Sequence, residues 1–296
     1  MKPPPFEYHR PASKDAALDL LGSLGDDAKV LAGGQSLMAL LNLRLARPAH
    51  LIDINRLNGA LSQIGSAANG GLSFGALVRQ RAAERSSVVG ERCPLLAEAL
   101  PQVGHHQIRN RGTVCGNLAH ADPASEMPAI AVALDGEMLA ESQARGQRTI
   151  RADDFFRGFL TTALEPDELL TEFRLPAWPT GAGWSFQEVS RRHGDYALVG
   201  VAAVVQLDPQ GTCTDARLAF TGAAAGPVRV REAESALKGA PISADAINAA
   251  AERVGPAIDP QSDVHATAAY RRHVAGVLAR RALHEAAGRA TRGARA

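Results

Sequence analysis

The chain has 296 residues, 46% of them hydrophobic, and its 32 lysines and arginines nearly balance its 31 aspartates and glutamates. This length can bury a large core and allows about two domains, while the balanced charge excludes a nucleic-acid partner. No run of about 18 apolar residues and no apolar signal region occurs, so we expect a cytoplasmic protein without a membrane span.

The cysteines favour a reducing compartment. Cys93, Cys115 and Cys213 are odd in number, widely spaced and not arranged in any CxxC pair. Iron–sulfur clusters are held by about four cysteine thiolates, so this chain cannot ligate one by itself.

The first part of the chain mixes short strands and helices. Apolar spacing predicts helices over residues 14–24, 37–45, 94–103 and 124–134, with Ser13 as the N-cap of the first. Alternating apolar residues predict strands over 6–8, 29–31, 50–55, 59–66, 70–78 and 169–175, and a hairpin over 137–150. Proline and glycine between residues 176 and 183 mark a domain boundary.

The second part has longer strands followed by helices. Antiparallel strands are expected over 184–189, 197–207 and 213–221, then helices over 231–238, 244–254 and 267–284. The arginines of the last helix are interpreted as a solvated face, and the basic residues 288–296 as a disordered tail. The fold class is therefore predicted as α+β.

Two glycine segments have the chemistry of anion binding. In the first glycine segment, residues 32–37, a strand leads into Gly33 and Gly34, then the Ser36 hydroxyl and a helix start. It is neither a GxGxxG fingerprint nor a P-loop, and a plain turn is the commoner use of a Gly-Gly pair. The second glycine segment, residues 112–117, is expected to be a loop that offers backbone N–H groups, a hydroxyl and a carboxamide. Together the two suit the pyrophosphate of a dinucleotide.

Other polar groups allow two interpretations. His105, His106 and His120 lie near acidic residues, but adjacent histidines on a strand point to opposite faces, so we expect no metal site. Residues 191–196 read as a hairpin turn with Gly194 at positive φ. Alternatively, Tyr196 could lie against a flat heterocycle.

Five segments carry a family resemblance, in order along the chain: AGGQSL (32–37), LIDI (51–54), RNRGTVCGN (109–117), AHADP (119–123) and RHGDY (192–196). They resemble the FAD-binding medium subunit of molybdenum hydroxylases, of the carbon monoxide dehydrogenase medium chain type, with the xanthine dehydrogenase flavin domain further off. The resemblance implies a p-cresol methylhydroxylase-type FAD-binding domain over 1–177, made of two small α+β subdomains (about 1–57 and 58–177). A C-terminal α+β domain with an antiparallel sheet and helices would follow over 178–287.

The resemblance also implies a site in which the two glycine segments embrace the FAD diphosphate. Glu126 stands at an acidic position that contacts the cofactor in xanthine dehydrogenase-like members, Leu169 or Leu170 aligns with a leucine near the flavin ring, and Tyr196 covers one ring face. The implied cofactor-binding residues are Leu31, Ala32, Gly33, Gly34, Gln35, Ser36, Leu37, Gly112, Thr113, Val114, Cys115, Gly116, Asn117, Ala121, Asp122, Glu126, Leu169, Leu170, Gln187, Asp195 and Tyr196. No catalytic residue and no metal ligand is expected.

Three positions depart from the family pattern. Gln35 stands where histidine is usual, so a protonation role there is lost. Cys115 replaces a common glycine, which brings a thiol toward the flavin or changes the loop. Many relatives carry a lysine at the position of Gln187 or Glu188, which this chain lacks.

The implied function is that of an electron-transfer subunit in a heterotrimer, or a dimer of heterotrimers. A large molybdopterin subunit would hydroxylate the substrate, a small subunit with two [2Fe-2S] clusters would relay electrons to this FAD, and an external acceptor would receive them. Two alternatives stay open: a self-sufficient flavin oxidoreductase of the same fold, and a non-catalytic nucleotide-binding assembly module.

Overall fold

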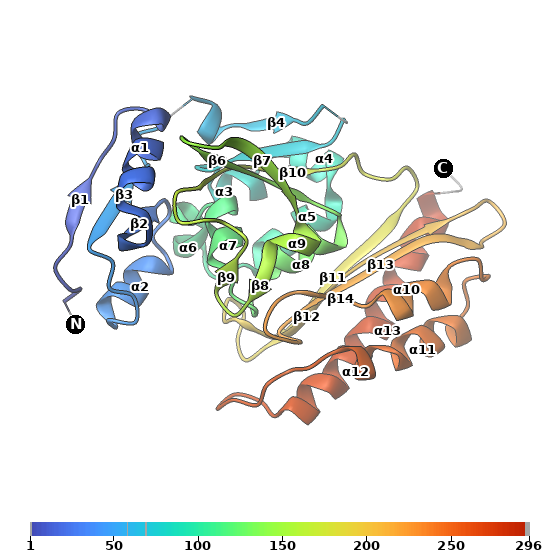
Figure 1. Ribbon diagram of the computed structural model, residues 1–296. Coiled ribbons are helices and arrows are strands. Elements are labelled where there is room, and N and C mark those ends of the chain that lie inside the picture. Colours follow the sequence, from blue (N-terminus) through green and yellow to red (C-terminus); the bar gives the residue numbers. More distant parts are fainter. Residues whose placement is uncertain (1, 58, 69, 294–296) are drawn as a thin grey trace.

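The computed structural model describes residues 2–57, 59–68 and 70–293, which form three successive α+β units (Figure 1). A small N-terminal unit, drawn in blue, stands beside a central unit, and the C-terminal unit with its long helix packs on the other side. No helix in the described ranges is both long and apolar enough to cross a membrane.

The N-terminal unit is a three-stranded parallel sheet in the order β1-β3-β2 (Glu7–His9, His50–Asp53, Ala28–Leu31). Helix α1 (Lys14–Leu24) covers it with Ala17, Leu18 and Leu21. The predicted cap is confirmed, because Ser13 Oγ accepts a hydrogen bond from the Ala16 N–H at 3.1 Å. A 3-10 turn η1 (Gly25–Asp27) precedes β2, and β2 leads through the first glycine segment into α2 (Leu37–Asn42).

The central unit is a five-stranded antiparallel sheet with helices packed on it. Its strand order is β4-β5-β10-β6-β7 (Ile64–Ser66, Leu72–Gly75, Leu169–Leu175, Glu137–Ser142, Gly146–Arg151). The remaining elements are η2 (Gly59–Ser62), α3 (Gln80–Glu84), α4 (Ser87–Arg92), α5 (Pro94–Ala99), η3 (Leu100–Gln102), α6 (His106–Arg111), α7 (Val114–His120), α8 (Glu126–Ala133), α9 (Ala152–Phe155), β8 (Phe156–Gly158) and β9 (Thr161–Thr162).

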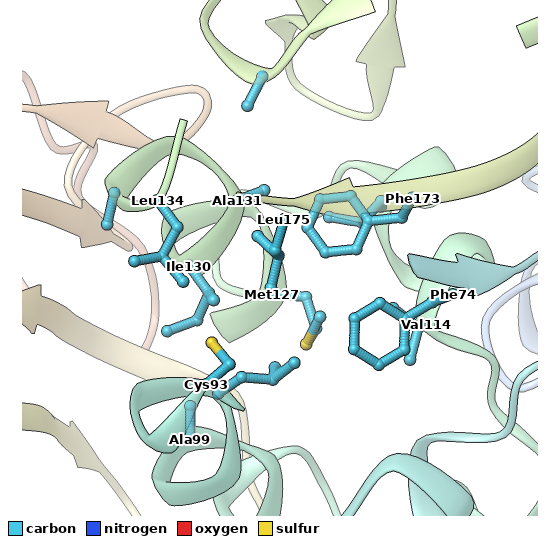
Figure 2. Packing of buried hydrophobic residues seen from close by; sticks show 14 of the residues in the cluster. Phe74, Cys93, Ala99, Val114, Met127, Ile130, Ala131, Leu134, Phe173 and Leu175 are labelled. Atoms are coloured by element: carbon cyan, nitrogen blue, oxygen red, sulfur yellow. The ribbon is translucent and has the colours of Figure 1, made fainter. Parts of the chain in front are cut away.

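The core of the central unit lies between the sheet and helices α5, α7 and α8 (Figure 2). The rings of Phe74 and Phe173 stack at 6.0 Å on neighbouring strands, and Met127 and Ile130 of α8 belong to the same core. All of α8 is buried, so it forms the centre of the molecule.

The C-terminal unit is an antiparallel sheet in the order β11-β12-β13-β14 (Gly183–Ser190, Ala197–Leu207, Cys213–Thr221, Val228–Arg229). Its helices are α10 (Arg231–Leu237), α11 (Ala244–Glu252), α12 (Val254–Ala257) and α13 (Ala268–Gly293). Alternation along β12 sends Ala202 and Val204 into the central core and Val201 and Val205 toward α13. Both faces of this sheet are therefore buried.

The sequence interpretation needs three corrections. Residues 112–117 are not a loop, since Thr113 caps helix α7 and the helix begins at Val114. The strands expected over 59–66 and 70–78 shrink to β4 and β5, with η2 before them. Residues 288–293 are not a disordered tail but the last turns of α13, while residues 294–296 lie outside the described ranges.

The end of α13 is held by Arg289. Its guanidinium donates to the Trp184 carbonyl at 2.9 Å and to Glu285 Oε1 at 2.6 Å, forms an ion pair with Glu98 of α5, and lies 4.8 Å from the centre of the Trp184 ring. These contacts order a segment whose composition alone resembles a solvated tail.

Candidate functional site

The first glycine segment crosses the edge of the N-terminal sheet with several backbone N–H groups unused. Gly34 has φ +73°, which favours glycine, and the Gln35 side chain donates to the Gly33 carbonyl at 3.3 Å. Among the described residues, the N–H groups of Gly34 and Gln35 have no protein acceptor. They are free to donate to a ligand.

The second glycine segment is the start of helix α7. Thr113 is its N-cap, and Thr113 Oγ1 accepts from the Gly116 N–H at 2.9 Å. Val114 N–H donates to the Val78 carbonyl at 3.0 Å, which fixes the segment to the central unit. Accepting this capping bond still leaves the O–H of Thr113 as a donor for a ligand in the cavity.

The thiol of Cys115 points away from a ligand. Cys115 Sγ donates to the Phe74 carbonyl at 3.3 Å within the central core. Burial raises the pKa of this thiol far above its usual range, so it stays protonated. A thiol acting beside the flavin is therefore not what this geometry provides.

Hydrogen bonds through the side chains of Arg79 and Asn55, called the polar strap below, connect the two glycine segments. Arg79, between β5 and α3, donates from Nη2 to Asn55 Oδ1 at 2.6 Å and from Nη1 to the Arg111 carbonyl. Asn55 Nδ2 donates in turn to the Ala32 carbonyl at 2.8 Å. The Arg79 guanidinium thus links the Arg111 carbonyl, just before the second glycine segment, with the Asn55 side chain that binds the first glycine segment.

Two carboxyl groups with raised pKa values lie where the central and C-terminal units meet. Glu126 is the first residue of α8, and burial, reinforced by the charge of Asp122, raises its pKa to about 7. On β11, burial and then the charge of Glu126 raise the pKa of Glu188 to about 8. Glu188 Oε2 is buried and has no hydrogen-bond partner among the described residues. Both carboxyls are therefore disposed to be protonated near neutral pH.

The hairpin between β11 and β12 reaches across to the N-terminal half. A Cβ on Gly194 would lie 2.2 Å from His105 Nδ1, so the hairpin tip touches the start of α6. Tyr196, 57% exposed, lines the same cavity as Ser36 of the first glycine segment. Tyr196 therefore brings the C-terminal unit to the wall of that cavity.

These elements enclose a cavity of about 600 Å³ between all three units. Of the sequence-predicted residues it brings together Ala32, Gly33, Gly34, Gln35, Ser36, Leu37, Gly112, Thr113, Cys115, Gly116, Asn117, Glu126, Leu169, Leu170, Asp195 and Tyr196. The volume suits a large organic ligand. Free backbone N–H groups at one glycine segment and an aromatic hydroxyl opposite fit a cofactor that combines phosphates with a flat ring.

Five predicted residues do not line this cavity. Leu31 lines an adjoining hollow of about 410 Å³ on the other side of the first glycine segment. Val114 and Ala121 are buried in the protein, and Asp122 accepts from the Ala124 N–H at 2.9 Å. Gln187 faces α13, where Gln187 Nε2 donates to Glu285 Oε2 at 3.0 Å, because strand alternation turns its neighbour Glu188 inward instead.

Comparisons with known proteins identify the family of this chain. Residues 4–178 match the model of the FAD binding domain in molybdopterin dehydrogenase, and residues 184–286 that of the CO dehydrogenase flavoprotein C-terminal domain. The chain belongs to the FAD-binding medium-subunit family of molybdopterin dehydrogenases. FAD is therefore its cofactor, and the chain is an oxidoreductase subunit.

Relatives in this medium-subunit family match over almost their full length. The 6-hydroxypseudooxynicotine dehydrogenase complex subunit alpha of Paenarthrobacter nicotinovorans is 42% identical, over 98% of this chain and 97% of that protein. The carbon monoxide dehydrogenase medium chain of Hydrogenophaga pseudoflava is 39% identical, over 97% and 98%. A solved structure of carbon monoxide dehydrogenase from the same organism matches with a TM-score of 0.94 at 40% identity, covering 98% of this chain and 99% of that one.

Sequence reasoning missed part of the cavity wall of this medium subunit. Ile108 lines it from α6, and Val103 and Gly104 line it from the turn before α6. The β8–β9 hairpin and the turn after it contribute Leu160, Thr161, Thr162, Leu164, Glu165 and Pro166. Only the Glu165-Pro166 turn had a sequence signal. The hairpin carries no motif, because its place in the site depends on packing against distant elements.

Proposed function

We propose that this chain is the electron-transfer subunit of a heterotrimeric molybdenum hydroxylase. In this proposal a large molybdopterin subunit acts on the substrate, and a small subunit carries two [2Fe-2S] clusters. Bound FAD supplies the redox chemistry, and this chain holds it between those clusters and an external acceptor.

One observation carries the proposal. The cavity between the two glycine segments lies in a chain that aligns over 98% of its length with a chain of a solved carbon monoxide dehydrogenase. The cysteines agree with clusters held in another subunit, since Cys93, Cys115 and Cys213 are all buried and unpaired.

The residues of this chain would position the cofactor and exclude water around it. Backbone N–H groups of Gly34 and Gln35 would donate to the diphosphate, as free amides at a glycine turn do. Tyr196 would lie over one face of the flavin ring from the cavity wall. Glu126 would present a carboxyl group to the cofactor from the cavity wall.

The same proposal includes the assembly of the complex and the domains of this chain. We expect a dimer of heterotrimers in the cytoplasm, with the FAD-binding domain over residues 1–177 as two subdomains and the C-terminal domain over 178–287. Size-exclusion chromatography with light scattering on the complex from the native source measures the oligomeric state. Identifying the cofactors of the copurified chains tests the partners.

The central test uses this chain by itself, then with its small subunit. We expect a yellow protein with one FAD per chain that turns over no small organic substrate alone. Anaerobic addition of the pre-reduced small subunit should bleach the flavin absorbance in a stopped-flow instrument. Substrate turnover by the isolated chain would favour a self-sufficient flavin oxidoreductase, and failure to retain FAD would reject both enzymatic readings.

A further inference from the structure

Three side chains with metal-binding atoms converge on the N-terminal sheet, and none of them lines the FAD cavity. Strands β1 and β3 run parallel, with Glu7 opposite His50 and His9 opposite Ile52. Side chains alternate along a strand, so Glu7 and His9 lie on one face of β1, next to His50. Tyr8 points to the other face, where its hydroxyl donates to Asp53.

The distances between the three donor atoms suit one metal ion. His9 Nε2 lies 3.1 Å from His50 Nδ1, and Glu7 Oε2 lies 3.5 Å from His50 Nδ1 and 3.9 Å from His9 Nε2. A point about 2.1 Å from all three atoms lies between them, which is the usual length of zinc–nitrogen and zinc–oxygen bonds. An ion could therefore bind with little movement of the backbone.

Hydrogen bonding alone leaves this cluster incomplete. Two imidazole nitrogens at 3.1 Å share one hydrogen bond, and the Glu7 oxygen is at 3.5 Å or more from either of them. The histidine side chains are 25% and 19% exposed and Glu7 is 74% exposed. The sheet thus fixes two ligands while the third stands on the solvent side, where an ion can enter.

We propose that Glu7, His9 and His50 form a binding site for a divalent transition-metal ion of the zinc class. Two imidazole nitrogens and one carboxylate are a ligand set that zinc accepts, with water in the fourth position, whereas calcium and magnesium prefer oxygen ligands. The ion cross-links residues 41 positions apart and ties the edge strand β1 to β3. Strand β3 also pairs with β2, which leads into the first glycine segment.

The test uses the full chain with its FAD, stripped of metal by a chelator and dialysed. Calorimetric titration with zinc chloride should show one zinc ion bound per chain, and zinc should raise the melting temperature. His50→Gln should weaken zinc binding more than about tenfold, because it removes one of only three protein ligands. Glu7→Gln should weaken it as well, and this exposed substitution leaves the fold unchanged, so it decides the matter if His50→Gln does not fold.

His284→Gln is the matched control, since His284 is an exposed histidine on α13. It should bind zinc like the wild type, and calcium chloride should give no heat with any variant. The site assignment fails if the wild type takes up no zinc, if the double variant His9→Gln/His50→Gln takes up as much as the wild type, or if His284→Gln loses binding equally. FAD content, measured in the same samples, reports separately on the flavin site.

Discussion

Gly33 lies directly against Gly112. A Cβ built on Gly33 would stand 2.6 Å from the Arg111 carbonyl oxygen and 2.7 Å from Gly112 Cα, distances that real Cβ atoms do not reach. The two glycine segments therefore touch through bare backbone, and the requirement for glycine at position 33 comes from the protein itself. The same contact sets the distance between the two walls of the cavity.

Gly33→Ala should consequently abolish FAD retention while leaving most of the fold intact. The added methyl group pushes the segments apart, since the backbone of the second is fixed by the Val114–Val78 hydrogen bond. Gly90→Ala is the control, because a Cβ there meets nothing within 4 Å and helix α4 gains from it. Absorbance at the flavin band per folded chain is the measurement, and full occupancy in Gly33→Ala would refute the contact's role.

Loss of the polar strap should weaken FAD binding without unfolding the chain. Arg79→Met removes the charged hydrogen bond to Asn55, whose loss costs about 1.5–3 kcal/mol, so FAD should bind roughly 10- to 100-fold more weakly. Arg79→Lys keeps the positive charge but lacks the two-armed guanidinium, so its FAD affinity should fall between those of the wild type and Arg79→Met. Fluorescence titration with FAD measures the affinity. An equal loss in Arg85→Met, an exposed neighbour, would show that general charge and not the strap is responsible.

The carboxyl group of Glu188 should make stability depend on pH. Its pKa is about 8 in the folded chain against 4.5 for the free group, so the folded state holds the proton more tightly. Stability from this group is full below pH 4.5 and is lost as the pH rises toward 8. Glu188→Gln removes the loss. The melting temperature of Glu188→Gln minus that of the wild type should therefore rise between pH 5 and pH 8.5, by roughly 2–4 °C for each kcal/mol of stability that ionisation of Glu188 removes.

Glu91→Gln serves as the comparison for this experiment, since Glu91 is an exposed carboxylate on α4. Its melting difference from the wild type should stay flat across the same pH range. A flat difference for Glu188→Gln as well would mean that Glu188 is ionised in the folded chain.

Cys115→Ala should leave FAD content and the flavin spectrum unchanged. The thiol points into the core, where the substitution removes a weak hydrogen bond and leaves a small void, so a modest loss of thermal stability is expected. Thiol-directed reagents should label this position only after unfolding. A changed flavin spectrum in the variant would place the sulfur beside the ring after all.

The sequence was sufficient where local rules decide the structure. The helix behind Ser13 and the strands of the C-terminal sheet follow from capping and apolar alternation, and they are found as expected. The prediction of a loop at Thr113 was wrong, because a short helix with little periodicity, such as α7, is stabilised by tertiary packing. The polar pair Gln187 and Glu188 also gave no sign of which residue faces inward, since only the packing of β11 between α13 and α5 decides it.

Arg289 contacts both Glu98 and Trp184, and the Arg289–Glu98 ion pair joins side chains 191 positions apart in the chain. Phe186 and Ala202, which follow the proline-rich boundary, belong to the same core as Phe74 and Met127. Two regions that read as separate modules along the sequence are therefore one cooperative unit in space. A fragment ending near residue 178 would expose the apolar surface that these side chains cover, and separating the halves would yield two aggregating pieces instead of two working domains.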